Sequence, residues 1–281
     1  MLLDYLVPVL VSMLFYCGVN IVLHYVVIPP AKLSEREKKD YFGEHISLIH
    51  SVFAATLAFT VYYKEGGINY DTPITMAHIF VIGHSMGYFT YDAIYAELFG
   101  LHDWAMRFHH IFVILGGFPV YFSSNGGSLG ITCCFLTEIS NPAMQLRLIL
   151  KSQGKTDTLL FKVSQFLFAS IFLFNRGVFG TFINYNSWQY DLNFMISISI
   201  SMLYGLSCFW NYVIILMLLK ELKGKGVTLK EKFIIKFIHF LKKYQKAIIA
   251  AIFIWATFMP HVFKYMGCTK HHIKIRNFTI I

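Results

Sequence analysis

Two adjacent histidines, His109 and His110, stand where an apolar run begins in "HDWAMRFHHIFVILGG", residues 102–117. A histidine beside a carboxylate can take up or release a proton near neutral pH and act as an acid or a base. Ionisable side chains are costly inside a bilayer, and there they indicate a functional site by default. The pair would suit acyl transfer onto an amine or a hydroxyl, and it is the candidate catalytic site if the chain is an enzyme.

Further polar residues interrupt the apolar segments at helical spacing. His78, Ser85 and Asp92 are seven positions apart, so on a helix they fall close to one face. A polar seam through a helical bundle is one interpretation. The other is structural, because polar side chains commonly bond to neighbouring membrane helices, and Asp92 can pair with Arg107 or Arg176.

A second polar face is predicted where Glu138, Asn141 and Gln145 follow an i, i+3, i+7 pattern. If both faces look inward, they enclose a polar-ended cavity with the histidine pair near its mouth. The expected polar residues of this lipid cavity are His50, His78, Ser85, Asp92, Glu138, Asn141, Arg147 and Arg176.

The sequence carries no motif for a metal or a resident cofactor. No HExxH or similar ligand spacing occurs in one segment, and no Walker loop, GxSxG elbow or dinucleotide fingerprint is present. The five cysteines show no CxxC spacing, so neither a disulfide framework nor a zinc site is indicated. We therefore expect no metal and no cofactor, with acyl-CoA as a co-substrate only if the chain is an acyltransferase.

The amino-acid composition indicates the environment in which these polar residues lie. The 281 residues are 56% hydrophobic and 14% charged, whereas soluble domains carry about 25% charged residues. A multi-pass membrane protein is therefore predicted. The net charge of +9 comes from lysines and arginines clustered in the connections, and this distribution argues against nucleic acid as a partner.

The expected fold is all-α, a membrane bundle of about seven transmembrane helices. A span needs about 20 mainly apolar residues, and no segment shows the alternation of a membrane barrel. A kink is expected at Pro142, which lacks the backbone N–H of a helical residue. The expected spans are residues 5–28, 45–63, 74–98, 108–122, 127–150, 158–183 and 194–219.

Charge asymmetry predicts the orientation. Basic residues concentrate in the connections before the second, fourth and sixth spans and after the seventh, while the alternate connections hold only Lys64 or none. By the positive-inside rule, the N-terminus lies outside and the chain from Lys220 onward lies inside.

Three regions are predicted. An N-terminal transmembrane helix and basic loop occupy residues 1–39, a membrane domain residues 40–222, and a basic extension residues 223–281. The extension is expected to form a basic amphipathic helix on anionic lipid, or docked on another subunit. Its apolar stretch, residues 247–263, is either a surface-lying or partner-buried helix or an eighth span.

Five segments occur in one order: "HISLIHSVFAA", "GHSMGYFTYDAI", "FHHIFVILGG", "FLTEISNPAMQLRLIL" and "FLFNRGVFG". Together they resemble the TLC-domain family, which ceramide synthases, translocon-associated Tram proteins and small TLC-domain-containing proteins share. The small proteins are the most similar group. Positions matching their pattern are Asp92, His109, Glu138, Pro142 and Arg147.

The resemblance implies six helices around a lipid-sized cavity, with an extra N-terminal span, and it leaves three functions open. One is a non-catalytic protein that binds or organises membrane lipid. The second is an acyl-CoA-dependent acyltransferase of ceramide-synthase type acting on a sphingoid base, in which His109 and His110 match the paired histidine. The third is an accessory subunit of a large membrane complex.

The membrane of residence follows from the resemblance alone. Endomembrane, in the endoplasmic reticulum or Golgi, is the expectation, and the mitochondrial inner membrane is the alternative. A seven-span receptor or ion carrier is a weaker interpretation, because the polar residues form no continuous relay across the bilayer.

Overall fold

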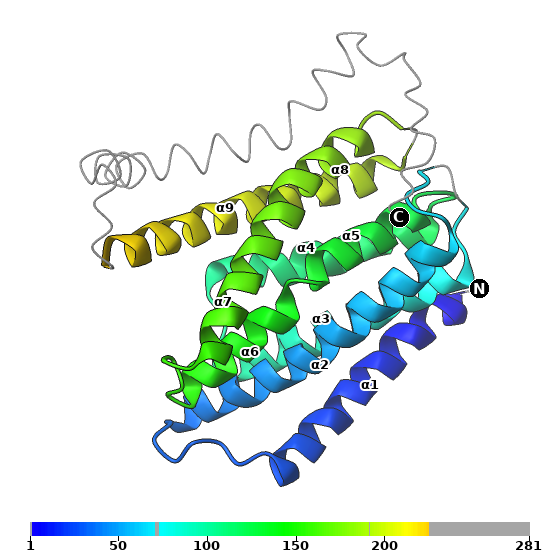
Figure 1. Cartoon of the computed structure of the whole chain (residues 1–281). Helices are drawn as coiled ribbons and strands as arrows, with labels where there is room; N and C mark the ends of the chain where they lie inside the picture. Colours follow the sequence, from blue (N-terminus) through cyan, green and yellow to red (C-terminus); the bar gives the residue numbers. More distant parts are fainter. Residues whose placement is uncertain (1, 71–72, 191, 225–281) are drawn as a thin grey trace.

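Helices make up most of the chain that is described by the computed structural model, which covers residues 2–70, 73–190 and 192–224. An all-helical membrane protein was expected, and the helical fold is confirmed (Figure 1). The basic C-terminal helix and residues 247–263 lie outside the described residues. The elements are α1 (Leu2–Val26), α2 (Glu35–Lys64), α3 (Met76–Phe99), α4 (Trp104–Phe122), α5 (Gly127–Glu138), α6 (Asn141–Ser152), α7 (Leu159–Phe172), η1 (Leu173–Phe179), α8 (Gly180–Ser187) and α9 (Phe194–Gly224).

Local sequence sets the helix ends. Ser34 and Thr75 cap α2 and α3, and each hydroxyl accepts a hydrogen bond from the backbone N–H three residues later. Asp103 caps α4 in the same way. Gly100 ends α3 in the left-handed conformation, which glycine adopts without strain. The connection between α3 and α4 is therefore short and fixed at both sides.

The segment expected as one kinked helix over residues 127–150 is two helices. The helix α5 ends at Glu138 and α6 begins at Asn141, with Pro142 in its first turn. Proline has no N–H to continue the hydrogen-bond ladder but fits the first turn of a helix, so it separates the two. Similarly, a π-helical turn, η1, interrupts the sixth expected span and carries Arg176.

The connections gather at two opposite ends of the bundle. One end, here called the basic end, holds the connections before α2, α4 and α7. There Arg36 donates to the carbonyl of Gly100 at 2.6 Å, and Gln153 donates to the Tyr41 hydroxyl at 2.8 Å. At the other end, the ring of Tyr70 stacks on Tyr190 with centroids 4.0 Å apart. Successive connections thus lie at opposite ends of the bundle, and those rich in lysine and arginine share one end, as the predicted orientation requires.

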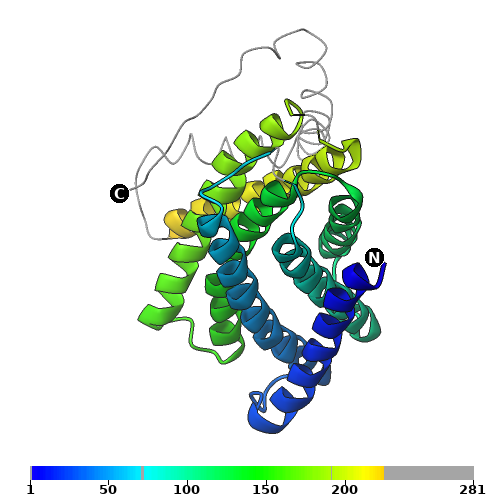
Figure 2. The same ribbon diagram turned by 90° about the vertical axis from the view of Figure 1, so that its right-hand side faces the viewer.

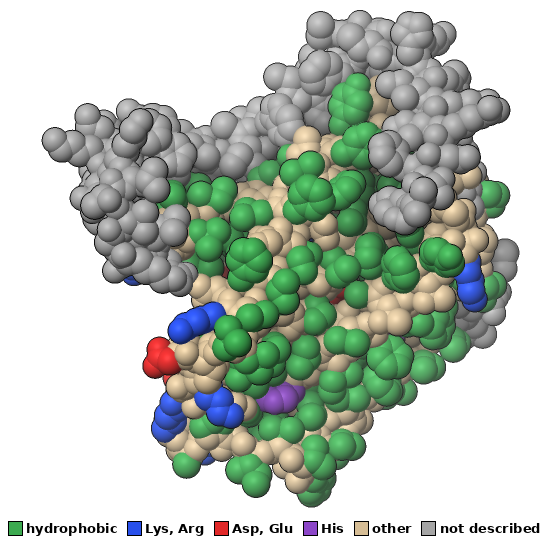
Figure 3. All heavy atoms as spheres, viewed as in Figure 1, with side chains coloured by type: hydrophobic (Ala, Val, Ile, Leu, Met, Phe, Trp, Pro, Cys, Tyr) green, Lys and Arg blue, Asp and Glu red, His purple; other side chains and the backbone are tan. Residues whose placement is uncertain are grey.

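Four of the described helical segments are individually long and apolar enough to cross a membrane: Leu6–Val26, Glu35–Lys64, Leu159–Ser187 and Phe194–Lys220. Seven were expected. The remaining helices are shorter or carry more polar residues in the bundle interior, such as the polar side chains of α3. Apolar side chains cover much of the outer face in Figure 3, as a lipid-facing surface requires.

The N-terminal helix α1 lies at the edge of the bundle (Figures 1 and 2) and packs closely on α3. Gly87 of α3 permits this approach. A Cβ atom placed on Gly87 would lie 2.3 Å from the carbonyl oxygen of Val9 and 2.6 Å from Cβ of Ser12. Small residues commonly allow membrane helices to pack backbone to backbone. The contact places Ser12 and Tyr16 against the bundle interior.

Candidate functional site

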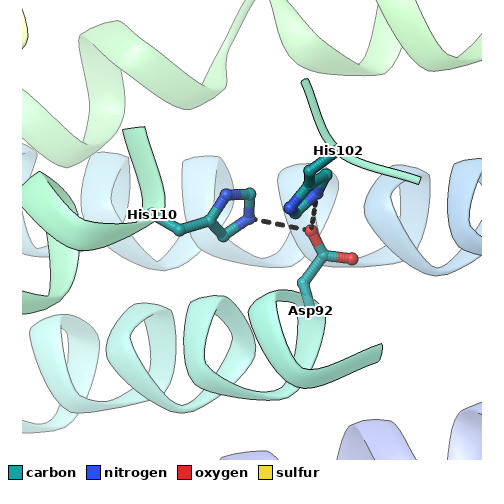
Figure 4. Close-up of side chains that lie close together, drawn as sticks. All are labelled: Asp92, His102 and His110. Atoms are coloured by element: carbon teal, nitrogen blue, oxygen red, sulfur yellow. Dashed lines mark hydrogen bonds and ion pairs between the residues drawn. The ribbon is translucent and has the colours of Figure 1, made fainter. Parts of the chain in front are cut away.

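Asp92, His102 and His110 form a compact group, here called the aspartate–histidine cluster (Figure 4). Asp92 comes from α3, His102 from the α3–α4 connection and His110 from α4. The Nε2 atom of His110 lies 2.8 Å from Oδ2 of Asp92, and Nε2 of His102 lies 3.6 Å from the same oxygen. His110 is buried, while the other two side chains are about one-tenth exposed. Access to the cluster from outside is therefore narrow. The α3–α4 connection that carries His102 places the cluster near the basic end.

Both ring nitrogens of His110 are engaged. Its Nδ1 lies 2.7 Å from the carbonyl oxygen of Met106, one helical turn earlier. A carbonyl only accepts hydrogen bonds, so Nδ1 carries the proton and Nε2 faces the carboxylate of Asp92. Each nitrogen of His110 thus lies against a protein oxygen.

The adjacent histidine, His109, points elsewhere. Its ring packs edge-on against Phe89 and Trp210, with centroids 5.3 Å away in both cases. The rings of His109 and His110 are 5.6 Å apart and inclined by 77°. Nδ1 of His109 is buried and has no hydrogen-bond partner among the described residues. The two histidines thus belong to different surroundings, as their 100° separation on a helix dictates.

A second buried group joins α1, α2, α3 and α5, and we call it the tyrosine–glutamate network: Ser12, Tyr16, His50, His84 and Glu138. The Tyr16 hydroxyl lies 3.2 Å from Nδ1 of His50 and 3.0 Å from Nε2 of His84. Nε2 of His50 lies 3.9 Å from Oε2 of Glu138, which is too far for a direct hydrogen bond.

Glu138 stands at the junction of α5 and α6. Oε2 of Glu138 accepts a hydrogen bond of 2.9 Å from the side-chain amide of Asn141, so these two residues are in contact although they lie on different helices. Arg176 is buried nearby on η1 and donates to the carbonyl of Thr137 at 2.6 Å. Its Nε has no hydrogen-bond partner among the described residues. A buried cation near a buried carboxylate lowers the cost of burying both.

The other predicted cavity residues are spread along the bundle. His78 accepts a hydrogen bond from the backbone N–H of Thr75 at 3.1 Å, and its Nε2 lies 2.6 Å from Glu65 at the end opposite the basic loops. Ser85 contacts the sulfur of Cys134 at 3.4 Å. Arg147 lies over the ring of Phe168 near the basic end.

The structure brings together residues that sequence reasoning did not select. Asp92 pairs with His102 and His110, not with either arginine considered for it: Arg107 instead pairs with Glu97 at 2.6 Å. His102 lies outside the apolar runs and so gave no membrane signal. Tyr16 gave none either, because a tyrosine in an apolar helix resembles an ordinary core residue.

A helical bundle with membrane-spanning segments and a buried polar interior defines a multi-pass membrane protein. Residues 41–222, more than half of the chain, match the TLC domain, and the chain belongs to the TLC-domain family. It is similar to TLC domain-containing protein 4 A of Dictyostelium discoideum, being 24% identical over 204 residues that cover 68% of this chain and 79% of that protein. The resemblance predicted from the five segments is thereby confirmed, and the family implies a lipid-related membrane protein.

Proposed function

We propose that this protein binds one membrane lipid without transforming it, with the polar part of the lipid at the tyrosine–glutamate network and an acyl chain on the apolar surface beside it. The gap of 3.9 Å between His50 Nε2 and Glu138 Oε2 carries the proposal. A hydroxyl oxygen beside these two atoms, at about 2.8 Å from each, can accept a hydrogen bond from the imidazole and donate one to the carboxylate.

Because both side chains are buried, it is unfavourable for Nε2 of His50 to have no polar atom beside it. His50 is 1% exposed and Glu138 3% exposed, and Nε2 of His50 has no hydrogen-bond partner among the described residues. Buried polar atoms are nearly always hydrogen-bonded to protein, water or ligand. A hydroxyl-bearing lipid supplies the missing partner.

An apolar groove lies on the adjacent surface of α1 and α2. Its volume is about 480 Å³, within the range of ligand sites. Phe15 and Ile49 line the groove, and their chain neighbours Tyr16 and His50 belong to the network. The full lining is Leu14, Phe15, Gly18, Val19, Val22, Leu23 and Ile49. An amphipathic ligand with an apolar tail fits this pairing of a groove with a polar interior.

The geometry of the histidine pair favours this role over acyl transfer. A general base needs a nitrogen within hydrogen-bond reach of the substrate proton. Both nitrogens of His110 lie against protein oxygens, and the ring of His109 packs edge-on against Phe89 and Trp210. Endomembrane residence, inferred from the family, is part of the same proposal.

Native mass spectrometry of the gently extracted protein tests the proposal. Gly18→Leu fills the groove, because a Cβ at Gly18 meets no atom within 4 Å. Val11→Leu is the matched control, since Val11 is an exposed residue of α1 outside the groove. We expect one retained lipid on the wild type and the control, and at least a several-fold loss in Gly18→Leu. Equal lipid on both variants, or none on the wild type, contradicts the proposal.

A further inference from the structure

The aspartate–histidine cluster has the chemistry of a metal site. It offers one carboxylate oxygen and two imidazole nitrogens, all within 4.8 Å of one another. Two histidines and one carboxylate are a common ligand set for zinc when one coordination position stays open. We propose that Asp92, His102 and His110 bind one divalent transition-metal ion, with zinc as the best match.

The distances agree with tetrahedral coordination. Two ligands that each bond zinc at about 2.0–2.1 Å lie about 3.3 Å apart in a tetrahedron. The separations from Asp92 Oδ2 are 2.8 Å to His110 and 3.6 Å to His102, which lie on either side of that value. Each of these two separations is within about half an ångström of the tetrahedral value, and all three ligand atoms lie within 4.8 Å of one another.

The orientation of His110 is that of a metal ligand. Its Nδ1–H donates to the carbonyl of Met106, so the lone pair of neutral imidazole is on Nε2. That lone pair faces a carboxylate oxygen at 2.8 Å, and the two atoms repel unless a cation lies between them. A hydrogen bond from one ring nitrogen to a backbone carbonyl is the usual support of a metal-bound histidine.

A proton is the rival cation, and the second histidine argues against it. The rings of His102 and His110 stack with centroids 4.4 Å apart and planes inclined by 27°. One proton on His110 satisfies Asp92, whereas the Nε2 of His102 lies 3.6 Å from the same oxygen, longer than an ordinary hydrogen bond. A metal ion uses both nitrogens, and the slight exposure of Asp92 and His102 leaves access for a water or a lipid oxygen as a fourth ligand.

The three ligands come from two helices and a connection, so no single segment shows ligand spacing. The elements that carry them are fixed. Gly100 ends α3 with a positive φ, Asp103 caps α4, and Arg36 bonds the Gly100 carbonyl. Because these contacts set the connection, His102 lies opposite His110 without a ligand to organise it. The site does not depend on the proposed lipid function.

Cobalt titration of the full-length, detergent-purified chain tests the site, with a non-histidine affinity tag. Co²⁺ in a tetrahedral site of this kind absorbs visible light, and elemental analysis gives the stoichiometry. We expect one Co²⁺ per chain, displaced by Zn²⁺. Asp92→Asn and His102→Ala are each expected to weaken binding more than ten-fold while the protein stays monodisperse.

Two control variants make the result specific. His45→Ala removes a histidine whose Nδ1 makes the same contact, 2.8 Å from the Tyr41 carbonyl, and it is expected to bind Co²⁺ as the wild type does. His271→Ala/His272→Ala removes the C-terminal pair of histidines and is also expected to keep the tight site. Binding that is absent from the wild type, unchanged in His102→Ala, or lost in the C-terminal variant overturns the proposal.

Discussion

Nε2 of His110 lies 2.8 Å from the carboxylate of Asp92, although 18 positions separate the two residues along the chain. The contact joins α3 to α4 inside the bundle, and both residues are mostly buried. Removing one partner of a buried polar contact is costly because the other is left without its hydrogen-bond partner.

Asp92→Ala is therefore expected to lower the free energy of unfolding by about 3 kcal/mol, as is usual when a buried hydrogen-bonded contact to a carboxylate is lost. Glu97→Ala is the control, because Glu97 and Arg107 pair at the surface with about half of each side chain exposed. Its expected cost is below about 1 kcal/mol. Thermal unfolding in one detergent compares the two. Equal losses of stability in the two variants would show that the buried Asp92 contact contributes no more than the surface pair.

Tyr16 is expected to contribute through its hydroxyl, because its ring remains in Phe. The hydroxyl contacts both His50 and His84, so Tyr16→Phe leaves two buried nitrogens without that partner. We expect a loss of about 1–3 kcal/mol. Tyr25→Phe, at an 85% exposed position of α1, is expected to be neutral. Indistinguishable unfolding curves for the two variants would contradict the network.

The close contact of α1 with α3 predicts opposite effects at two glycines. Gly87→Ala forces a methyl group against the backbone of α1 and is expected to cost about 1–3 kcal/mol. Gly18→Ala meets no atom and lies inside a helix, so it is expected to stabilise by up to about 1 kcal/mol. Chemical unfolding measures both. An unchanged stability in Gly87→Ala would mean that α1 does not pack backbone to backbone on α3 at this position.

The two-ended arrangement of the connections predicts which loops face the cytosol in an endomembrane. Lys155→Cys lies at the basic end and Lys64→Cys at the opposite end, and both side chains are exposed. In sealed vesicles with the cytosolic side outward, a membrane-impermeant thiol reagent is expected to label only Lys155→Cys. The protein without the added cysteine gives the background. Labelling of only Lys64→Cys would reverse the orientation.

Sequence reasoning predicted the helices well where hydropathy decides them. All seven apolar segments are helical, and Pro142 marks a real interruption, since its missing N–H ends the ladder. Two separate helices form in place of one kinked helix, and Pro142 lies in the first turn of the second. The extent of each helix beyond its apolar part, as at residues 35–44 of α2, depends on capping by Ser34.

The site was less predictable, because its contacts join separate segments. Asp92 and Glu138 stand out in a sequence as carboxylates in apolar runs, but periodicity does not give their partners. His102 becomes relevant only once the α3–α4 connection folds over Asp92. Tyr16 becomes relevant only once Gly87 lets α1 approach α3. Both depend on tertiary packing.

Photo-crosslinking in cell membranes tests the central claim most directly. A photoactivatable, clickable sphingoid lipid is activated in membranes that contain the protein, and the crosslinked peptides are identified by mass spectrometry. We expect crosslinks on the α1 and α2 segments that contain Gly18 and Ile49, lost in Gly18→Leu and kept in Val11→Leu. Crosslinks spread evenly over the exposed apolar surface, and unchanged in Gly18→Leu, would contradict a specific lipid site.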